Sequence, residues 1–275
     1  AKRLTPRPVP DWLSRDVRWS DWPKLLNLTG DAADAVAAQV AKLDEIRQTV
    51  VATSQVPLYV NDPVAVTAEG TPVRIIRNAE TNLGDLCADA YRALSNADIA
   101  FVNGGGIRKQ IEAGDITLDD IYSVHPFGNT MCVIRVTGQQ VLDALEWGAR
   151  AVPSENGGFL QVSGLTYEIH TGVASSAEKD ENGMFTRVSG EYRVKNVMVG
   201  GQPLELDKTY TLASHNYMLL GHGDGYTMFD GCEVLGEDMM VDNQVLITYI
   251  TTTLGGVVGE QYANPYGDGR IVAVE

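Results

Sequence analysis

The chain has few basic residues and no long apolar segment, and each shortage excludes a class of protein. Its 275 residues include 21 Lys and Arg against 36 Asp and Glu, which gives a net charge of −15. This balance argues against a nucleic-acid polymer or an anionic membrane as the main partner. No run of about 18 apolar residues occurs, so we expect no membrane span.

Cysteine is also scarce, with only Cys87, Cys132 and Cys232 in the chain. Their number is odd, their spacing is wide and no CxxC pattern occurs. Cys87 and Cys132 both lie in apolar segments, which favours buried free thiols. A Cys87–Cys132 disulfide remains the alternative.

Motifs for metal binding and for nucleophilic catalysis are missing as well. The sequence has four histidines but no DxH, HExxH or GNH pattern, and no GxSxG pattern. His222 and Asp224 form the one close His/Asp pair, and two ligands do not make a catalytic metal site. We therefore expect no metal, no cofactor and no catalytic residue in this chain.

Proline and hydrophobic periodicity divide the chain into three parts. Residues 1–30 hold several prolines and three tryptophans, and we interpret them as an arm or the remnant of an inter-domain linker. Apolar residues at helical spacing predict a linker helix over 31–50. The remaining residues, 51–275, are expected to form one domain.

Within that domain, helices are frequent early and hairpins are frequent late. We predict helices at 82–95, 118–123, 138–150 and 239–253. We predict strands at 57–60, 72–77, 98–102, 131–136, 159–169, 184–189, 191–199, 203–206, 208–213 and 270–274. Residues 172–183 read as a surface loop, and Gly200-Gly201 as a hairpin turn. This order favours an α+β layered domain over a doubly wound sheet.

Three polar segments could carry a binding site. In 103–108 (NGGGIR), glycines that adopt positive φ would let a ligand approach between Asn103 and the Arg108 guanidinium, although a turn with a surface salt bridge is the alternative. In 125–129 (HPFGN), Phe127 could stack on a base or fill the core. In 214–226, Tyr217 offers a second ring, and Asp224 could accept ribose hydroxyls or cap its own turn.

These segments belong to a longer ordered series. The series consists of 80–86 (ETNLGDL), 103–108 (NGGGIR), 114–117 (GDIT), 126–129 (PFGN), 159–164 (FLQVSG) and 223–226 (GDGY). Together they resemble the C-terminal domain of the 5′-nucleotidase family, which includes UDP-sugar hydrolases and 2′,3′-cyclic-nucleotide phosphodiesterases. The similarity runs from about residue 31 to residue 275.

The resemblance implies an α/β/β/α sandwich that recognises a nucleotide. Phe127 and Tyr217 would stack on the base, Asp224 would hold the ribose, and Asn103, Arg108 and Asn129 would contact the substrate. A further phosphate-binding arginine is common in the family near 80–82, and no position is assigned to it here. Two divalent metal ions would lie in an N-terminal metallophosphoesterase domain that this chain does not contain.

We therefore expect the recognition half of a phosphoric-ester hydrolase, inactive by itself, in an extracellular, cell-surface or periplasmic protein. A free-standing nucleoside-binding module is the alternative. The same architecture could also act on a cyclic nucleotide or a nucleotide sugar. The preferred base, surface anchoring and oligomeric state stay open.

Overall fold

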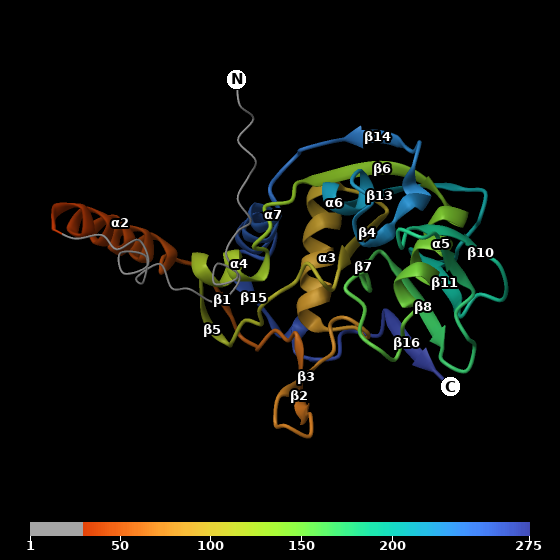
Figure 1. Ribbon diagram of the computed structural model, residues 1–275, viewed down its shortest axis with the longest axis horizontal. Coiled ribbons are helices and arrows are strands. Elements are labelled where there is room, and N and C mark those ends of the chain that lie inside the picture. Colours follow the sequence, from red (N-terminus) through yellow and green to blue (C-terminus); the bar gives the residue numbers. More distant parts are fainter. Residues whose placement is uncertain (1–29) are drawn as a thin grey trace. The chain divides into compact units, whose positions relative to one another are not determined.

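A computed structural model describes residues 30–275, and the tryptophan-rich arm lies outside this range. Contacts divide the chain into a unit ending at Thr49 and a second unit, Val50–Glu275. Helix α2 (Asp31–Arg47) belongs to the first unit and has the helical conformation predicted for it (Figure 1). The second unit holds all the other elements described below. Within the described residues, no helix has both the length and the apolar composition to cross a bilayer.

A mixed five-stranded sheet forms the centre of the second unit. Its strands, in spatial order, are β14 (Glu233–Gly236), β6 (Met131–Thr137), β13 (Thr209–His215), β4 (Ile99–Asn103) and β7 (Leu160–Ser163). Strands β13 and β4 are parallel neighbours, while the other neighbours are antiparallel. The carboxyl ends of β4 and β13 therefore lie at the same edge of the sheet.

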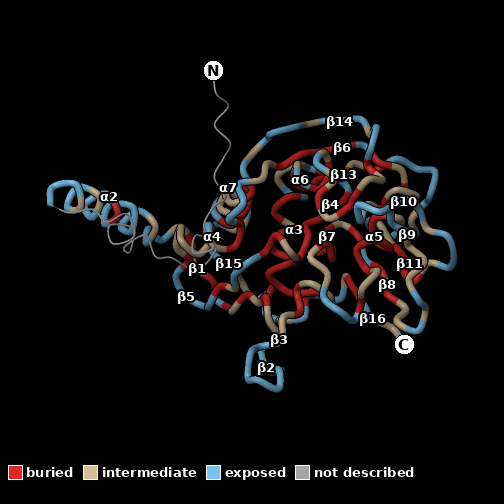
Figure 2. Tube along the Cα trace, in the orientation of Figure 1, coloured by how far each residue is buried: buried red, intermediate tan, exposed pale blue. Residues whose placement is uncertain are grey.

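Residues of this sheet alternate between two buried clusters, as expected for a sheet covered on both faces. Ala100 and Val102 join a cluster with helix α3 (Asn82–Ser95), whereas Ile99 and Phe101 join a cluster with helix α5 (Gly138–Ala149). Figure 2 shows buried chain along β4, β7 and α3. Helices thus cover the sheet from both sides and complete the predicted α+β layers.

A four-stranded sheet lies beyond α5. Its order is β12 (Gln202–Pro203), β11 (Val194–Val199), β8 (Leu165–His170) and β16 (Ile271–Val274). Helix α5 contacts β6 and β7 of the central sheet and also β11, so it links the two sheets. The structure confirms the predicted α+β layered fold.

Smaller elements complete the unit. A three-stranded sheet has the order β15 (Val257–Val258), β1 (Val50–Ser54) and β5 (Gly114–Thr117). Two further pairs of strands form two-stranded sheets: β9 (Ala177–Lys179) with β10 (Phe185–Val188), and β2 (Asn61–Val66) with β3 (Pro72–Arg74). The other helices are α4 (Leu118–Val124), α6 (Asn216–Leu219), α7 (Asp242–Thr248), the π-helical turn η5 (Tyr249–Thr253), and the 3-10 turns η3 (Gly223–Gly225), η4 (Thr227–Phe229) and η6 (Glu260–Tyr262).

Local sequence signals explain several of these boundaries. Thr81 caps α3 by accepting a hydrogen bond from the Gly84 backbone N–H at 3.0 Å. Thr117 and Asp120 form the reciprocal capping box that begins α4. The hairpin between β11 and β12 turns at Gly200 and Gly201, both with positive φ, which confirms the predicted turn.

Other predictions were wrong, mostly where a strand depends on its partner. The strand predicted at 159–169 is two strands, because Gly164 has a φ of 81° and breaks it. The loop predicted at 172–183 contains β9, and residues 57–60 make only an isolated bridge at Leu58. Strands β1, β2, β5, β14 and β15 were not predicted.

The cysteine prediction is confirmed. Cys87 and Cys132 are both buried and both free, so the alternative disulfide does not form. Burial raises the pKa of the Cys132 thiol, with a further rise from Glu237 and Asp238 and an opposing hydrogen bond from the Asp238 backbone. A buried thiol with a raised pKa is chemically inert.

Candidate binding site for a polar, aromatic ligand

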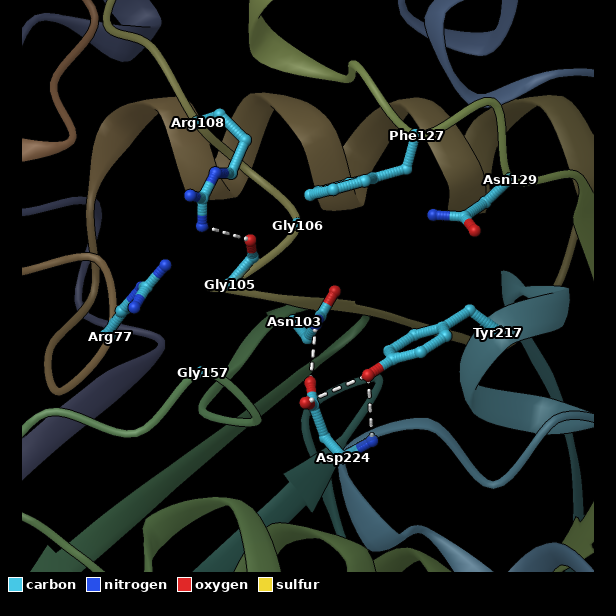
Figure 3. Close-up of a pocket in the computed structure, with 10 residues that line it drawn as sticks. All are labelled: Arg77, Asn103, Gly105, Gly106, Arg108, Phe127, Asn129, Gly157, Tyr217 and Asp224. Carbon is cyan, nitrogen blue, oxygen red and sulfur yellow. Dashed lines mark hydrogen bonds between the residues drawn. The ribbon is translucent and has the colours of Figure 1, made fainter. Parts of the chain in front are cut away.

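A cavity of about 500 Å³ opens beside the carboxyl ends of β4 and β13. Its lining residues come from six separate segments of the chain (Figure 3): Arg77, Asn103, Gly105, Gly106, Arg108, Phe127, Asn129, Gly157, Tyr217 and Asp224. This volume is typical of small-molecule sites. All six residues predicted from the sequence to contact substrate, Asn103, Arg108, Phe127, Asn129, Tyr217 and Asp224, lie around this one cavity.

The glycine turn after β4 allows backbone segments to approach one another closely. A Cβ on Gly104 would lie 2.1 Å from the carbonyl oxygen of Ile76, and one on Gly105 would lie 2.8 Å from that of Gly157. The Gly105 N–H donates to this same Gly157 carbonyl at 2.7 Å. The expectation of positive φ at these glycines was wrong. Glycine is needed at positions 104 and 105 because the neighbouring backbone leaves no room for a Cβ.

A hydrogen-bonded series of side chains crosses the floor of the cavity. Asn103 Nδ2 donates to Asp224 Oδ2 at 2.6 Å, and the Tyr217 hydroxyl donates to Asp224 Oδ1 at 3.2 Å. His215 Nε2 lies 2.9 Å from Asn103 Oδ1. Asp224 adopts a left-handed conformation (φ 54°), and its carbonyl accepts from Trp147 Nε1 at 2.9 Å. Asp224 is therefore held at both its backbone and its side chain.

Two aromatic side chains lie on opposite sides of the cavity in Figure 3. Phe127 is 59% exposed and Tyr217 is 43% exposed. Phe127 stands on a turn whose next residue, Gly128, has a φ of 66°. Gly223 makes room for the other ring, since a Cβ there would lie 2.3 Å from it. Both rings therefore have exposed surface at the cavity, which a flat ligand could contact.

Two arginines lie at one end of the cavity. Arg108 Nη1 donates to the Gly105 carbonyl at 3.2 Å, and its guanidinium lies 5.8 Å from the centre of the Phe127 ring. Burial, followed by repulsion from Arg74 and Arg108, lowers the pKa of Arg77. The Nε of Arg77 is buried and has no hydrogen-bond partner in the described residues. This end of the cavity is suited to an anion.

Arg77 and Gly157 are the lining residues that the sequence did not identify. Arg77 precedes the 80–86 segment, and this position was its one signal in the sequence. Gly157 reaches the site through its backbone contact with Gly105. The position of both residues at the cavity follows only from the folded structure.

Asn129 is anchored by a buried carboxylate. Its N–H donates to Asp242 Oδ2 at 3.2 Å, and its carbonyl accepts from the Asp242 N–H at 2.8 Å. Burial raises the pKa of Asp242 to about 6, although hydrogen bonds from Asn243 and Asn129 oppose the shift. This pair joins the aromatic turn to the first residue of α7.

Within residues 30–275, no histidine belongs to a group of three or more side chains placed to hold a metal ion. The imidazole of His222 pairs with Asp230 rather than with Asp224, its neighbour in sequence. Burial lowers the pKa of His125 to about 4. Burial, with a smaller effect of His125, lowers the pKa of His215 to about 3. Both buried histidines are therefore neutral at physiological pH.

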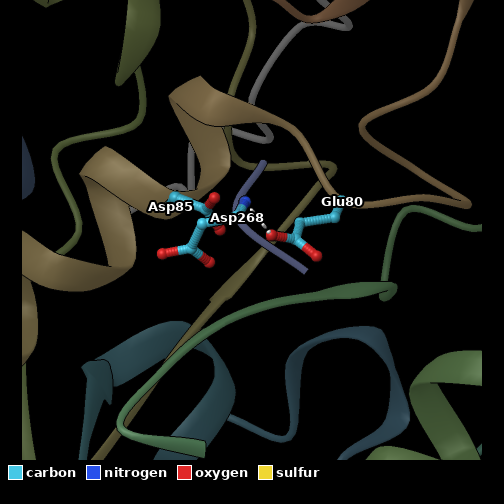
Figure 4. Close-up of side chains that lie close together, drawn as sticks. All are labelled: Glu80, Asp85 and Asp268. Atoms are coloured by element: carbon cyan, nitrogen blue, oxygen red, sulfur yellow. Dashed lines mark hydrogen bonds between the residues drawn. The ribbon is translucent and has the colours of Figure 1, made fainter. Parts of the chain in front are cut away.

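Three carboxylates outside the cavity are close enough to share a cation (Figure 4): Glu80, Asp85 and Asp268. Arg270 already compensates them, with Nε 3.5 Å from Asp85 and 2.8 Å from Asp268. Burial raises the pKa of Asp85 to about 9, although Arg270 opposes the shift. The group is therefore better described as a partly buried, arginine-compensated network, in which Asp268 is exposed, than as a metal centre.

Comparison with known proteins agrees with this architecture. The family model described as 5′-nucleotidase, C-terminal domain, matches residues 50–231. The chain belongs to this family. It is 36% identical over 203 residues to the trifunctional nucleotide phosphoesterase protein YfkN of Bacillus subtilis, an alignment that covers 72% of this chain and 13% of that protein. It is 33% identical over 176 residues to a 5′-nucleotidase of Vibrio cholerae, covering 64% of this chain and 28% of that protein.

A solved structure shares the fold of this 5′-nucleotidase C-terminal domain. The 5′-nucleotidase precursor of Thermus thermophilus superposes with a TM-score of 0.69 at 29% identity, over 88% of this chain and 43% of that one. The chain thus spans less than half the length of these relatives.

Proposed function

We propose that this domain is the nucleotide-recognition half of a two-domain phosphoric-ester hydrolase. The observation that carries the proposal is the cavity itself, where two exposed rings oppose each other and two guanidiniums lie at one end. Stacking contributes about 1–3 kcal/mol per base and tolerates different bases. Such a cavity suits a nucleoside that carries an anionic group.

Each lining side chain has a role in the proposal. Phe127 and Tyr217 enclose the base, and Asn129 lies beside it. Asp224 accepts hydrogen bonds from the ribose hydroxyls, with Asn103 holding its carboxylate. Arg77 and Arg108 bind the phosphate, and they supply local positive charge in a chain whose net charge is −15.

Hydrolysis would take place on a partner domain. The family resemblance implies an N-terminal metallophosphoesterase domain of the same polypeptide, with two divalent metal ions that activate water. Binding energy from base and ribose would orient the phosphate towards that centre. We place the full-length protein outside the cytoplasm, at the cell surface, in the periplasm or secreted.

The test is a calorimetric titration of the 275-residue chain with adenosine and with AMP, without metal. We expect both to bind, AMP at least as tightly as adenosine, and we expect no phosphate release from AMP when Mg²⁺, Mn²⁺ or Zn²⁺ is added. Binding of neither ligand, or hydrolysis by this chain alone, would contradict the proposal.

Two variants test the ribose contact and the phosphate contact separately. Asp224→Ala should weaken adenosine binding more than binding of 2′,3′-dideoxyadenosine, and equal losses would remove Asp224 from the ribose. Arg77→Met should weaken AMP but not adenosine. Arg187→Met is the matched control, because Arg187 is an exposed arginine paired with Glu178 and does not line the cavity.

A further inference from the structure

A buried histidine that the proposed function does not use contacts Asn103, one of the residues that line the cavity. His215 is the last residue of β13 and is 2% exposed, so no ligand in the cavity can reach much of it. Its ring lies against Tyr91 of α3, with centroids 6.3 Å apart, and against Tyr217, with centroids 5.9 Å apart. Its one hydrogen bond among the described residues joins Nε2 to Asn103 Oδ1 at 2.9 Å.

The direction of this hydrogen bond follows from its neighbours. Asp224 accepts from Asn103, so the Asn103 amide presents its NH₂ group to Asp224 and its oxygen to His215. An amide oxygen only accepts, which requires the proton of neutral His215 to be on Nε2. The other ring nitrogen, Nδ1, is buried without a partner, and a proton there would be an unsatisfied buried donor.

We propose that His215 is a positioning residue that sets the orientation of the Asn103 amide and, through it, of the Asp224 carboxylate. Without the imidazole donor, the buried amide oxygen of Asn103 would lose its partner and the amide could turn over. A turned amide would present its oxygen to Asp224, where two acceptors repel. The Asp224 carboxylate would then lose its Asn103 donor and keep only the Tyr217 hydroxyl, at 3.2 Å, among its side-chain partners.

This inference rests on the proposed function, because it assigns His215 to ribose recognition by the same cavity. It predicts that loss of the His215 donor affects only ligands that contact Asp224. Stacking between Phe127 and Tyr217 should continue, since neither ring is hydrogen-bonded to His215 and a leucine at this position keeps an apolar contact with the Tyr217 ring. The effect of His215 should therefore depend on the ribose hydroxyls of the ligand.

The experiment compares His215→Leu with His215→Gln in the 275-residue chain, using adenosine and 2′,3′-dideoxyadenosine as probes. Leucine removes the donor at similar volume, whereas the glutamine NH₂ can still donate to Asn103. We expect wild type to prefer adenosine about tenfold or more, as for a hydrogen bond to a charged group. His215→Leu should reduce this ratio towards one with dideoxyadenosine binding unchanged, and His215→Gln should retain most of it.

Two results would overturn the positioning role. An unchanged ratio in His215→Leu would show that Asn103 needs no donor. Equal losses for both ligands, in the leucine and the glutamine variant alike, would show a merely structural residue. Thermal unfolding of each variant separates these cases from loss of the fold.

A measurement without ligand keeps this inference separate from the proposed function. Nitrogen NMR of the labelled chain, with the His215 signals assigned by their absence in His215→Gln, reports which ring nitrogen carries the proton. A proton on Nε2 supports the positioning role, and a proton on Nδ1 refutes it. If wild type binds neither nucleoside, the proposed function fails, while the tautomer still decides how His215 holds Asn103.

Discussion

At the scale of single residues, the cavity combines exposed rings with glycines that admit them. Phe127 is the clearest case, because its ring is more than half exposed and does not pack into either hydrophobic cluster. The sequence left open whether this ring stacks on a ligand or fills the core. Its exposure in the folded chain excludes the second of these roles.

Phe127→Ala should weaken adenosine binding by about 1–3 kcal/mol, the contribution of one stacked base, with little change in folding stability. Calorimetry and thermal unfolding measure the two effects. Tyr122→Ala is the matched control, since Tyr122 is an exposed aromatic on α4 that does not line the cavity. An unchanged affinity in Phe127→Ala would remove this ring from the site.

Gly223→Ala should displace the Tyr217 ring, because the new methyl group would lie 2.3 Å from its carbons. We expect adenosine affinity to fall about tenfold, comparable to the loss of one stacking partner. Gly172→Ala should have no effect, since no atom lies within 4 Å of its added carbon. Equal adenosine affinities for the two variants would show that the Tyr217 ring can shift without weakening binding.

At the scale of elements, α3 is joined to the last strand by a network of buried charges. Glu80, just before the helix, accepts backbone N–H groups from Asp268, Gly269 and Ile271 at 2.7–3.0 Å. Arg270 makes a bidentate pair with Asp89 of α3, at 2.7 and 2.9 Å. These contacts link elements that are about 190 residues apart in the chain.

Asp85→Asn should make the folding stability less dependent on pH. The pKa of Asp85 is raised from 3.8 to about 9 in the folded chain. The contribution of protonated Asp85 to the free energy of unfolding is therefore complete below about pH 4 and is lost as the pH rises towards 9. An amide stays neutral throughout. In denaturant unfolding, the free energy of unfolding of the variant should rise relative to wild type by about 1.4 kcal/mol for each pH unit between pH 5 and pH 8.

Glu80→Gln provides the contrast for this measurement. The Glu80 carboxylate accepts three N–H groups, and an amide would turn a donor towards one of them. We expect this variant to lose about 1–3 kcal/mol of folding stability at neutral pH. Equal behaviour of the two variants would mean that Asp85 is ionised in the fold.

At the scale of the whole molecule, folding and binding are expected to reside in Val50–Glu275. Both hydrophobic clusters consist entirely of residues from Ala52 onwards. Every residue lining the cavity also lies in this unit.

A chain that begins at Val50 should therefore fold with a thermal midpoint within about 3 °C of the 275-residue chain, a shift of about 1 kcal/mol or less. Its affinity for adenosine should be the same. Thermal unfolding and calorimetry of the two chains test this expectation. A large loss of either quantity would place residues 1–49 within the functional domain.

Elements whose signals are local could be predicted from the sequence. The capping residues of α3 and α4, the glycine hairpin after β11 and the apolar stripe of α3 depend on neighbours a few residues away. Three of the six motifs also contain five of the predicted side chains that gather at the cavity, and the sixth, Tyr217, lies in segment 214–226. Short strands such as β14 and β15 were not predicted, because so few residues form a strand only when a partner strand is present.

Tertiary structure alone decided how these side chains act together. Asn103 and Asp224 are 121 residues apart, and Asn103 and His215 are 112 apart, so no local pattern could show their hydrogen bonds. Arg77 and Gly157 entered the site in the same way, through packing of separate segments around the turn after β4. Hydrogen bonds act only over about 3 Å, and only the folded sheet brings these groups within that distance.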